Sequence, residues 1–412
     1  MRAISFNIHP RRWLATKAMG RWWPAVYWSR LSGLRLREVP PPALPGPEWV
    51  RLRTLLGGVC GTDLAAVTLR NHPASFLRNL SNWPMWLGHE NVAVVDETGP
   101  QVAGWGKGDR VTVDPALSCV PRGVTPLCGP CAEGRPALCE NTAAGPLPPG
   151  TMIGYNNFTG GSWGEYFVAH QSQLHRVPAA IPDRMAVLTD PVACALHAAL
   201  RHRPADDERV LVLGGGLLGM GVIAALRAIG CRAHVTALVR HDHQAELARA
   251  FCADATLVSP RGQSHADRYD DIARLVGGRR VPGQFGNQML IGGYDAAYDC
   301  VGTGRSLTDA MKFTRARGTV VALGTSQICV VDTTPLWFGE LNVIGCSGRQ
   351  IERFEGRSLH TYDVLFELIG QGRVSLERIP TETFPLGRFR EAFAALVGPR
   401  RRPICRAVFC FA

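Results

Sequence analysis

The stretch Arg209-Val210-Leu211-Val212-Leu213-Gly214-Gly215-Gly216-Leu217-Leu218-Gly219 joins an apolar run to a glycine-rich turn. Residues 220–229 follow it and contain one charged side chain, Arg227. A short apolar run bounded by glycines predicts a buried strand, and the apolar segment after the turn predicts a helix. Such a turn binds pyrophosphate, because glycines let phosphates approach the backbone amides at the positive end of the helix. The predicted cofactor contacts are Gly214, Gly216, Leu217, Leu218 and Gly219.

The next predicted strand, residues 233–239, indicates which nicotinamide cofactor is favoured. A site for NAD places an acidic residue about twenty positions after the last glycine, where it binds the ribose 2′-hydroxyl. No acidic residue occurs between Cys231 and His241, and Arg240 follows the strand directly. A carboxylate would repel the 2′-phosphate of NADP, whereas a guanidinium pairs with it. The sequence therefore favours NADP over NAD.

Further strands are predicted at residues 254–258, 294–302 and 318–324. Strands that alternate with helices predict a doubly wound parallel sheet. Residues 191–344 are therefore expected to form an α/β cofactor domain.

Two short motifs nearer the start contain metal-binding side chains, GGVCGTD at 57–63 and LGHE at 87–90. Thiolate and imidazole are the ligands that zinc prefers, and a catalytic zinc has about three protein ligands and one open position. A single buried Cys or His is more often a packed core residue. Here, however, Cys60 follows a predicted strand and His89 precedes one, so both lie where a scaffold can hold a ligand rigidly.

With these motifs the chain resembles the zinc-dependent medium-chain alcohol and polyol dehydrogenases, over nearly its whole length. The family pairs a GroES-like, mainly β catalytic domain with a Rossmann domain, here expected as residues 1–190 completed by 345–412, and 191–344. In that family the Cys and His bind the catalytic zinc, the Glu is a nearby or alternate ligand, the Thr relays the alcohol proton, and the Asp supports the His. The resemblance implies these roles for Cys60, His89, Glu90, Thr62 and Asp63.

The resemblance also implies a third catalytic ligand at Asp190. Polyol-type members have Glu-Pro where Asp190-Pro191 stands here, and other members have a Cys. The shorter Asp side chain leaves two alternatives, direct ligation by Asp190 or a water-mediated contact with Glu90 coordinating instead. Cys194 and His197 fall on a predicted helix beginning near Pro191 and are expected to be core residues.

A second cluster of cysteines has the spacing C-x8-C-x2-C-x7-C. It comprises Cys119, Cys128, Cys131 and Cys139. Four thiolates so close in sequence predict a closed tetrahedral structural zinc, which would stabilise a lobe poor in regular structure. The family's usual spacing is x2, x2, x7, so the first interval is longer here and Thr125 stands at the regular position. The alternative is a lobe that has lost its zinc.

Composition is that of a soluble globular chain of two or three domains, with 412 residues, 46% of them hydrophobic and 19% charged. No run of about eighteen uncharged apolar residues occurs, so no membrane partner is expected. The net charge is +11, but the only local basic run is Arg400-Arg401-Arg402, so no nucleic-acid partner is expected either. Thirteen cysteines and no secretory signal predict reduced thiols and a cytoplasmic location.

Residues 9–33 interrupt the two first strands that the family pattern predicts, 1–6 and 34–40. This segment mixes basic residues with tryptophans, and no acidic residue precedes Glu38. Such a composition is typical of transit peptides and interfacial helices. Because the segment lies between two strands of the fold, a surface flap or a subunit contact is the favoured interpretation.

The expected function is hydride transfer between NAD(P) and an alcohol, aldehyde or ketone, with zinc as Lewis acid and Thr62 as proton carrier. In many relatives the proton relay reaches a His five residues after the ligand Cys, but Ala65 stands there, so His72 or solvent would end it. Relatives form homodimers or homotetramers.

Two alternatives remain from the sequence. A zinc-free enone or quinone reductase would lack the set of Cys60, His89 and Asp190. A non-catalytic nucleotide- or nucleic-acid-binding module would have basic residues clustered beside the four cysteines, where only Arg122 and Arg135 occur.

Overall fold

The computed structural model describes residues 1–75, 81–325, 328–397 and 404–411. The chain divides into two compact units, and each is described by itself. The first comprises Met1–Asp190, Arg349–Phe366 and Ile379–Ala412, and the second comprises Pro191–Gly348 and Glu367–Arg378. Residues 367–378 thus group with the second unit, whereas the sequence analysis placed them in the first. The run Arg400-Arg401-Arg402 lies outside the described residues.

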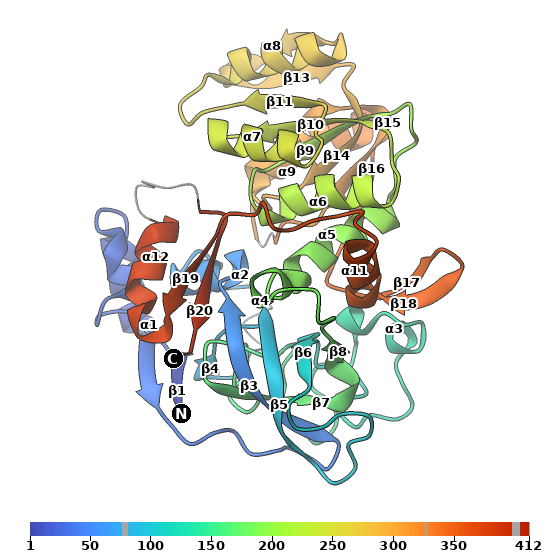
Figure 1. Cartoon of the computed structure of the whole chain (residues 1–412). Coiled ribbons are helices and arrows are strands. Elements are labelled where there is room, and N and C mark those ends of the chain that lie inside the picture. Colours follow the sequence, from blue (N-terminus) through green and yellow to red (C-terminus); the bar gives the residue numbers. More distant parts are fainter. Residues whose placement is uncertain (76–80, 326–327, 398–403, 412) are drawn as a thin grey trace. The chain divides into compact units, whose positions relative to one another are not determined.

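Strands dominate the first unit (Figure 1). They are β1 (Arg2–Phe6), β2 (Leu34–Glu38), β3 (Trp49–Gly58), β4 (Met85–Trp86), β5 (Asn91–Thr98), β6 (Arg110–Val113), β7 (Tyr166–His170), β8 (Leu174–Arg176), β17 (Ile351–Phe354), β18 (Arg357–His360), β19 (Thr381–Pro385) and β20 (Arg406–Cys410). The largest sheet has the order β19-β20-β3-β5-β6-β8, with β7 also paired to β3, and a smaller sheet has the order β2-β1-β4. The predicted mainly β catalytic domain is confirmed.

Short helices connect these strands. They are α1 (Pro10–Met19), η1 (Pro24–Trp28), α2 (Gly61–Val67), α3 (Gly129–Ala132), η3 (Pro136–Leu138), η4 (Gln171–Gln173), α4 (Asp183–Ala186), η6 (Leu386–Arg388) and α12 (Phe389–Val397). β3 pairs with β5, β7 and β20, and its alternate side chains Val50 and Leu52 are fully buried in the core on one face of the sheet. The loops at the two ends of β3 and β5 are therefore fixed to a rigid core.

The second unit is a layered α/β structure (Figure 1). Its strands are β9 (Arg209–Leu213), β10 (His234–Val239), β11 (Ala255–Val258), β12 (Arg279–Pro282), β13 (Gln288–Ile291), β14 (Tyr294–Asp299), β15 (Thr314–Ala322) and β16 (Asn342–Gly345). The helices are α5 (Thr189–Arg201), α6 (Leu217–Ala228), α7 (Asp242–Ala250), α8 (His265–Val276), η5 (Gln284–Gly286), α9 (Gly304–Phe313), α10 (Thr334–Phe338) and α11 (Thr361–Gly370), of which α5 and α11 cross a boundary between the units.

Six strands of this unit form one sheet in the order β11-β10-β9-β14-β15-β16, and every neighbouring pair is parallel. This is the strand order of a doubly wound dinucleotide-binding sheet. β10 and β11 lie on one side of β9, and β14, β15 and β16 lie on the other. The predicted Rossmann fold is confirmed. The long connection at 261–292 forms α8 and the separate hairpin β12–β13. Among the described residues, no helix is long and apolar enough to cross a membrane.

Candidate metal and cofactor sites

Cys60 lies between the end of β3 and the start of α2, where it is the N-cap residue. Its backbone N–H donates to Oδ2 of Asp63, at 3.1 Å, which closes the first turn of the helix. Asp63 is fully buried. The short helix therefore fixes the backbone that carries the Cys60 thiol.

His89 lies just before β5 and faces the same carboxylate. Its Nδ1 lies 3.4 Å from Oδ1 of Asp63. The hydroxyl of Tyr155 donates to that Oδ1 at 2.9 Å, and the Tyr155 and His89 rings are 5.8 Å apart. Histidines that bind metal with one nitrogen ordinarily direct the other toward a carboxylate or carbonyl, and this pair has that arrangement.

Glu90 is fully buried and forms an ion pair with Arg406 of β20, at 2.9 Å. Arg406 also donates to the carbonyl of Val59, at 2.6 Å. A Cβ on Gly58 would lie 2.3 Å from Oε2 of Glu90, so the carboxylate occupies space that only a glycine leaves. Burial raises the pKa of Glu90, and the Arg406 guanidinium opposes part of that rise.

One ligand atom from each of Cys60, His89 and Glu90 lies within 4.8 Å of the other two. The oxygens of Glu90 and the hydroxyl of Thr62 are buried and make no hydrogen bond of good geometry. Burial lowers the pKa of His89, but Asp63 and Cys60 outweigh burial and raise it well above its usual value. The site thus stabilises a positive charge, and one thiolate, one imidazole and one carboxylate fit zinc.

Asp190 lies outside this group of three. Its Oδ1 accepts a hydrogen bond from the Tyr362 hydroxyl at 2.7 Å and lies 3.1 Å from Nε of Arg349. Arg349 also bonds Asp114, at 3.0 Å. The carboxylate of Asp190 is therefore held by two partners of its own. His197 is buried on α5.

Sequence reasoning did not identify Tyr155, Arg349, Tyr362 or Arg406 at this site. Each contacts its partner carboxylate across at least 92 residues of sequence, as Tyr155 does with Asp63. No local pattern carries such a signal. Aligned relatives that keep these side chains together with their partners would have revealed them.

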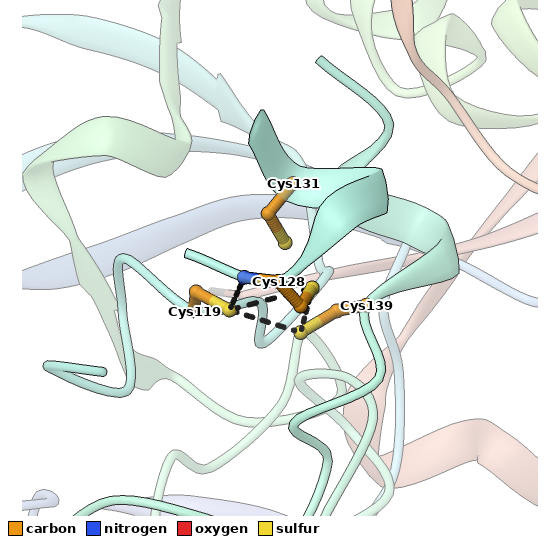
Figure 2. Close-up of side chains that lie close together, drawn as sticks. All are labelled: Cys119, Cys128, Cys131 and Cys139. Atoms are coloured by element: carbon orange, nitrogen blue, oxygen red, sulfur yellow. Dashed lines mark hydrogen bonds between the residues drawn. The ribbon is translucent and has the colours of Figure 1, made fainter. Parts of the chain in front are cut away.

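The second cysteine cluster brings four thiols together from a single loop (Figure 2). The Sγ of Cys119 lies 3.6 Å from the Sγ of Cys128 and 3.6 Å from that of Cys139. The Cys128 and Cys139 sulfurs are 4.0 Å apart. A tetrahedral zinc about 2.3 Å from each sulfur requires sulfur–sulfur distances of about 3.8 Å. Cys131 completes the group, with all four sulfurs within 4.8 Å of one another.

Hydrogen bonds around this cluster suit thiolates. Asn141 donates its side-chain amide to the Cys119 sulfur, at 3.2 Å, and its backbone N–H to the Cys139 sulfur, at 3.3 Å. The lobe is closed by Arg122, which is fully buried. Its guanidinium donates to the carbonyls of Leu117, Ala144, Leu147, Pro148 and Gly150. Because its guanidinium is buried and bonded to these carbonyls, Arg122 stabilises the lobe and presents no positive charge at the surface for nucleic acid.

The glycine turn has the close packing that a nucleotide site needs. Gly214 has a φ of +117°, which favours glycine. A Cβ on Gly219 would lie 1.9 Å from the carbonyl oxygen of Gly214, so helix α6 can approach the turn only without a side chain there. Gly216 is the N-cap of α6, followed by Leu217 and Leu218. The backbone amides at this helix start can receive a phosphate.

Arg240 lies directly after β10, beside this turn. The N–H of Gly214 donates to the carbonyl of Leu238 at 3.0 Å, which fixes the end of β10 next to the glycines. The Arg240 side chain is exposed, and its backbone N–H donates to Gln244 at 3.0 Å. The nearest acidic residue in sequence, Asp242, opens helix α7.

Two family models match the chain. The one described as alcohol dehydrogenase GroES-like domain matches residues 46–179, and the one described as zinc-binding dehydrogenase matches residues 218–363. Together they match more than half of the 412 residues.

Curated relatives match along most of the chain. An L-idonate 5-dehydrogenase of Vitis vinifera is 26% identical over 370 residues, which are 88% of this chain and 89% of that protein. An L-threonine 3-dehydrogenase of Cutibacterium acnes is 29% identical over 366 residues, 88% and 91% of the two chains. A sorbitol dehydrogenase of Arabidopsis thaliana is 24% identical and covers 86% of each chain.

Solved structures share the fold. An alcohol dehydrogenase from E. coli CFT073, solved with NADH, superposes with a TM-score of 0.71 at 22% identity, covering 92% of this chain and 96% of that one. A zinc-binding dehydrogenase from Sinorhizobium meliloti 1021, solved with NADP, has a TM-score of 0.68 at 23% identity and the same coverage.

Proposed function

This chain belongs to the zinc-type medium-chain dehydrogenase/reductase family of NAD(P)-dependent oxidoreductases, and from that premise we propose which residues carry its chemistry. Cys60, His89 and Glu90 hold the catalytic zinc. The proposal rests on one observation, that a thiol from one loop and an imidazole and a carboxylate from a second loop bring their ligand atoms within 4.8 Å of one another. Bound zinc supplies a Lewis acid that polarises an alcohol or carbonyl oxygen.

Asp190 takes a different part in this proposal. Because Arg349 and Tyr362 already bind its carboxylate, Glu90 is the protein ligand and Asp190 binds a water at the site. Burial raises the pKa of Glu90, and the neighbouring Asp190 contributes to that rise, so the two carboxylates lie close enough to interact. This is the water-mediated alternative that the shorter Asp side chain suggested.

Thr62 and Asp63 support the reaction in distinct ways. The buried Thr62 hydroxyl makes no hydrogen bond of good geometry within the described residues and lies near the Tyr155 hydroxyl, so it is available to take the proton of a substrate hydroxyl. Asp63 orients His89 and accepts from Tyr155. Ala65 cannot carry a proton, so no side-chain relay continues along α2. His72 is exposed to solvent, so the proton passes to solvent beyond the C-terminal end of α2.

Cys119, Cys128, Cys131 and Cys139 hold the structural zinc in this proposal. The cofactor pyrophosphate binds at the turn that contains Gly214, Gly216 and Gly219 and the start of α6, with Leu217 and Leu218. Arg240 selects NADP through its guanidinium, which is exposed and makes no hydrogen bond or ion pair in the described part of the chain. The names of the relatives point to a small polar substrate that carries several hydroxyl or amino groups.

A metal count tests the proposal. Elemental analysis of the wild-type chain should give two zinc ions per chain, and Cys60→Ser and Cys128→Ser should each retain one. NADPH should bind more tightly than NADH, and Arg240→Asp should reverse that order, because a carboxylate repels the 2′-phosphate. One zinc that is unchanged in Cys60→Ser would instead support a zinc-independent reductase.

Assembly and location complete the proposal. The edge strand β16 and helix α10 expose apolar side chains, among them Trp337 at 70%, Phe338 at 63% and Val343 at 43%. We assign this face of the second unit to a homodimer contact, which sedimentation of Trp337→Ser would test. None of the thirteen cysteines forms a disulfide within the described residues, which fits a reducing compartment such as the cytoplasm.

A further inference from the structure

The inserted segment 9–33 is anchored firmly on its inner side. Val26 and Trp28 of η1 are buried, and the Trp28 ring stacks on Phe393 of α12 at 6.3 Å and 22°. Arg390 of α12 donates to the carbonyl of Trp28 at 3.0 Å, and Lys17 of α1 donates to the carbonyl of Leu69. The segment is therefore a fixed part of the first unit, and its outer side has a defined composition.

Several apolar side chains of this segment are exposed to solvent. The exposed ones are Leu14 at 65%, Met19 at 38%, Trp22 at 80%, Trp23 at 47% and Leu31 at 47%. Single exposed apolar residues are normal on protein surfaces. Five within eighteen residues of sequence, including two adjacent tryptophans in the turn after α1, are a concentration typical of a contact surface.

The same segment carries basic side chains without acidic partners. The exposed ones are Arg11, Arg12, Arg21 and Arg30, together with Lys17, whose ammonium is held at the Leu69 carbonyl. None of the five forms an ion pair within the residues that the structure describes. The first acidic residue of the chain is Glu38.

The fold adds more positive charge to the same place. Burial lowers the pKa of Arg35 on β2, and the nearby charges of Arg12, Arg37 and Arg390 lower it further. Cations from α1, β2 and α12 thus lie close enough to repel one another. An anionic partner would reduce the electrostatic repulsion among these positive side chains.

We propose that the outer side of residues 9–33 is a contact surface for an anionic phospholipid bilayer. Tryptophan rings favour the interface between headgroups and acyl chains, and arginines favour an anionic leaflet. Leu14, Met19 and Leu31 would enter the acyl boundary beside the tryptophans. No membrane partner is expected from the sequence, which has no spanning run and favours a surface flap or a subunit contact for residues 9–33, whereas the contact proposed here is peripheral and reversible.

Two other partners fit the surface less well. The phosphates of nucleic acid could pair with the arginines and its bases could stack on the tryptophans, but the exposed aliphatic side chains of Leu14, Met19 and Leu31 would stay without an apolar partner. A second copy in a twofold contact would bring the same patch against itself, so the four exposed arginines would face four more. An anionic lipid surface satisfies both the charges and the apolar groups.

Vesicle co-sedimentation of the full-length protein tests the proposal. The wild type should bind vesicles of phosphatidylcholine with about a third phosphatidylserine, fail to bind pure phosphatidylcholine, and be released by high salt. Trp22→Ser/Trp23→Ser should reduce the partition coefficient at least about tenfold, because both rings leave the interface. Arg11→Glu/Arg12→Glu should reduce it by a similar factor through lost attraction.

Matched controls lie in the second unit. Phe285→Ser removes an aromatic side chain that is fully exposed, and Arg261→Glu/Arg279→Glu makes the same charge change as the arginine pair above. Both controls should bind vesicles like the wild type, and all variants should keep their zinc content. These readouts need no substrate, so they are independent of the proposed reaction.

Three results would overturn the proposal. The first is no binding that depends on phosphatidylserine, or an equal loss in the controls. The second is binding to a short DNA duplex that prevents vesicle binding and persists in Trp22→Ser/Trp23→Ser. The third is a wild-type oligomer that the tryptophan substitutions dissociate in sedimentation velocity, which would assign the surface to a second copy.

Discussion

The two clusters of candidate metal ligands differ in how the fold assembles them. The four-cysteine cluster comes from one loop, Cys119 to Cys139, and its sulfurs face one another with amide donors at the rim. The cluster of Cys60, His89 and Glu90 comes from loops at the ends of β3 and β5 and depends on side chains from distant segments. The four-cysteine cluster, called the closed site below, can be built locally. The cluster of Cys60, His89 and Glu90, called the open site, needs the tertiary fold to hold each ligand while one position on the metal stays free.

The largest expected effect is on the closed site. Cys128→Ser should release its zinc and unfold the lobe at residues 115–150, because structural zinc contributes on the order of 10 kcal/mol to such folds. Limited proteolysis should then cut within the lobe, and elemental analysis should show one zinc fewer. Cys252→Ser, an exposed free thiol, is the control. A lobe that stays resistant in Cys128→Ser would show that the cysteines are not needed for its fold.

The open site should respond in the opposite way. Cys60→Ser should lower kcat/KM at least about 10³-fold, since the metal contributes several kcal/mol to stabilising the transition state. The melting temperature should change little, because α2 and the strands keep their own packing. Loss of the fold instead of the activity would remove the distinction between a structural and a catalytic site.

A third effect concerns the carboxylates beside the open site. Asp114 bonds Arg349 at 3.0 Å and His360 at 3.1 Å, and Arg349 also binds Asp190. Burial tends to raise the pKa of Asp114, but Arg349 and His360 outweigh it and hold it well below its usual value. Asp114→Asn should therefore lower the free energy of unfolding at pH 7 by about 3 kcal/mol, because Arg349 loses a buried counter-charge.

The pH dependence of that loss has a defined sign. A depressed pKa contributes stability above the unfolded value of about 3.9, and that contribution disappears as the pH falls toward the folded value. The difference between wild type and Asp114→Asn in urea unfolding should thus be full at pH 7 and shrink below about pH 4. Asp206→Asn, on an exposed carboxylate, should change little at either pH. A difference that stays constant down to pH 3 would mean that packing, not charge, stabilises this region.

The smallest expected effect separates the two sites most sharply. Tyr155→Phe removes one hydroxyl that donates to Asp63, so the open site should lose about tenfold in zinc affinity while the closed site is unchanged. Competition with a chelator measures both affinities in the same sample. Tyr166→Phe on β7 serves as the matched control. Equal zinc release in both variants would exclude Tyr155 as a positioning residue.

The sequence predicted the cofactor sheet because its signal is local. Strand β9, the glycine turn and α6 follow one another within twenty residues, and handedness rules then limit the topology. The same reasoning could not separate residues 367–378 from the first unit, because α11 runs across the boundary without any break in its pattern.

The metal clusters show the same limit at the level of side chains. The cysteine spacing pointed to Cys119 through Cys139 directly, and the motifs around Cys60 and His89 pointed to the second cluster. The partners of Glu90 and Asp190 could not be predicted from the sequence, because Arg406 is 316 residues from Glu90 and Tyr362 is 172 residues from Asp190. The exposure of Trp22 and Trp23 also required the structure, since tryptophans in an insertion are as readily expected in a core.

The pairing of β20 with β3 has a consequence for how the protein is made. Arg406, which faces Glu90, lies on the last strand, and Val408 pairs with Gly58 on β3. At roughly 10 residues per second, the ribosome needs on the order of half a minute after the four cysteines to reach that strand. The closed site can therefore mature on the nascent chain, while residues 56–58 of β3 lack their β20 partner until that strand has been made. Chaperone binding and truncation should act on the open site first, because it is the last part of the first unit to be completed.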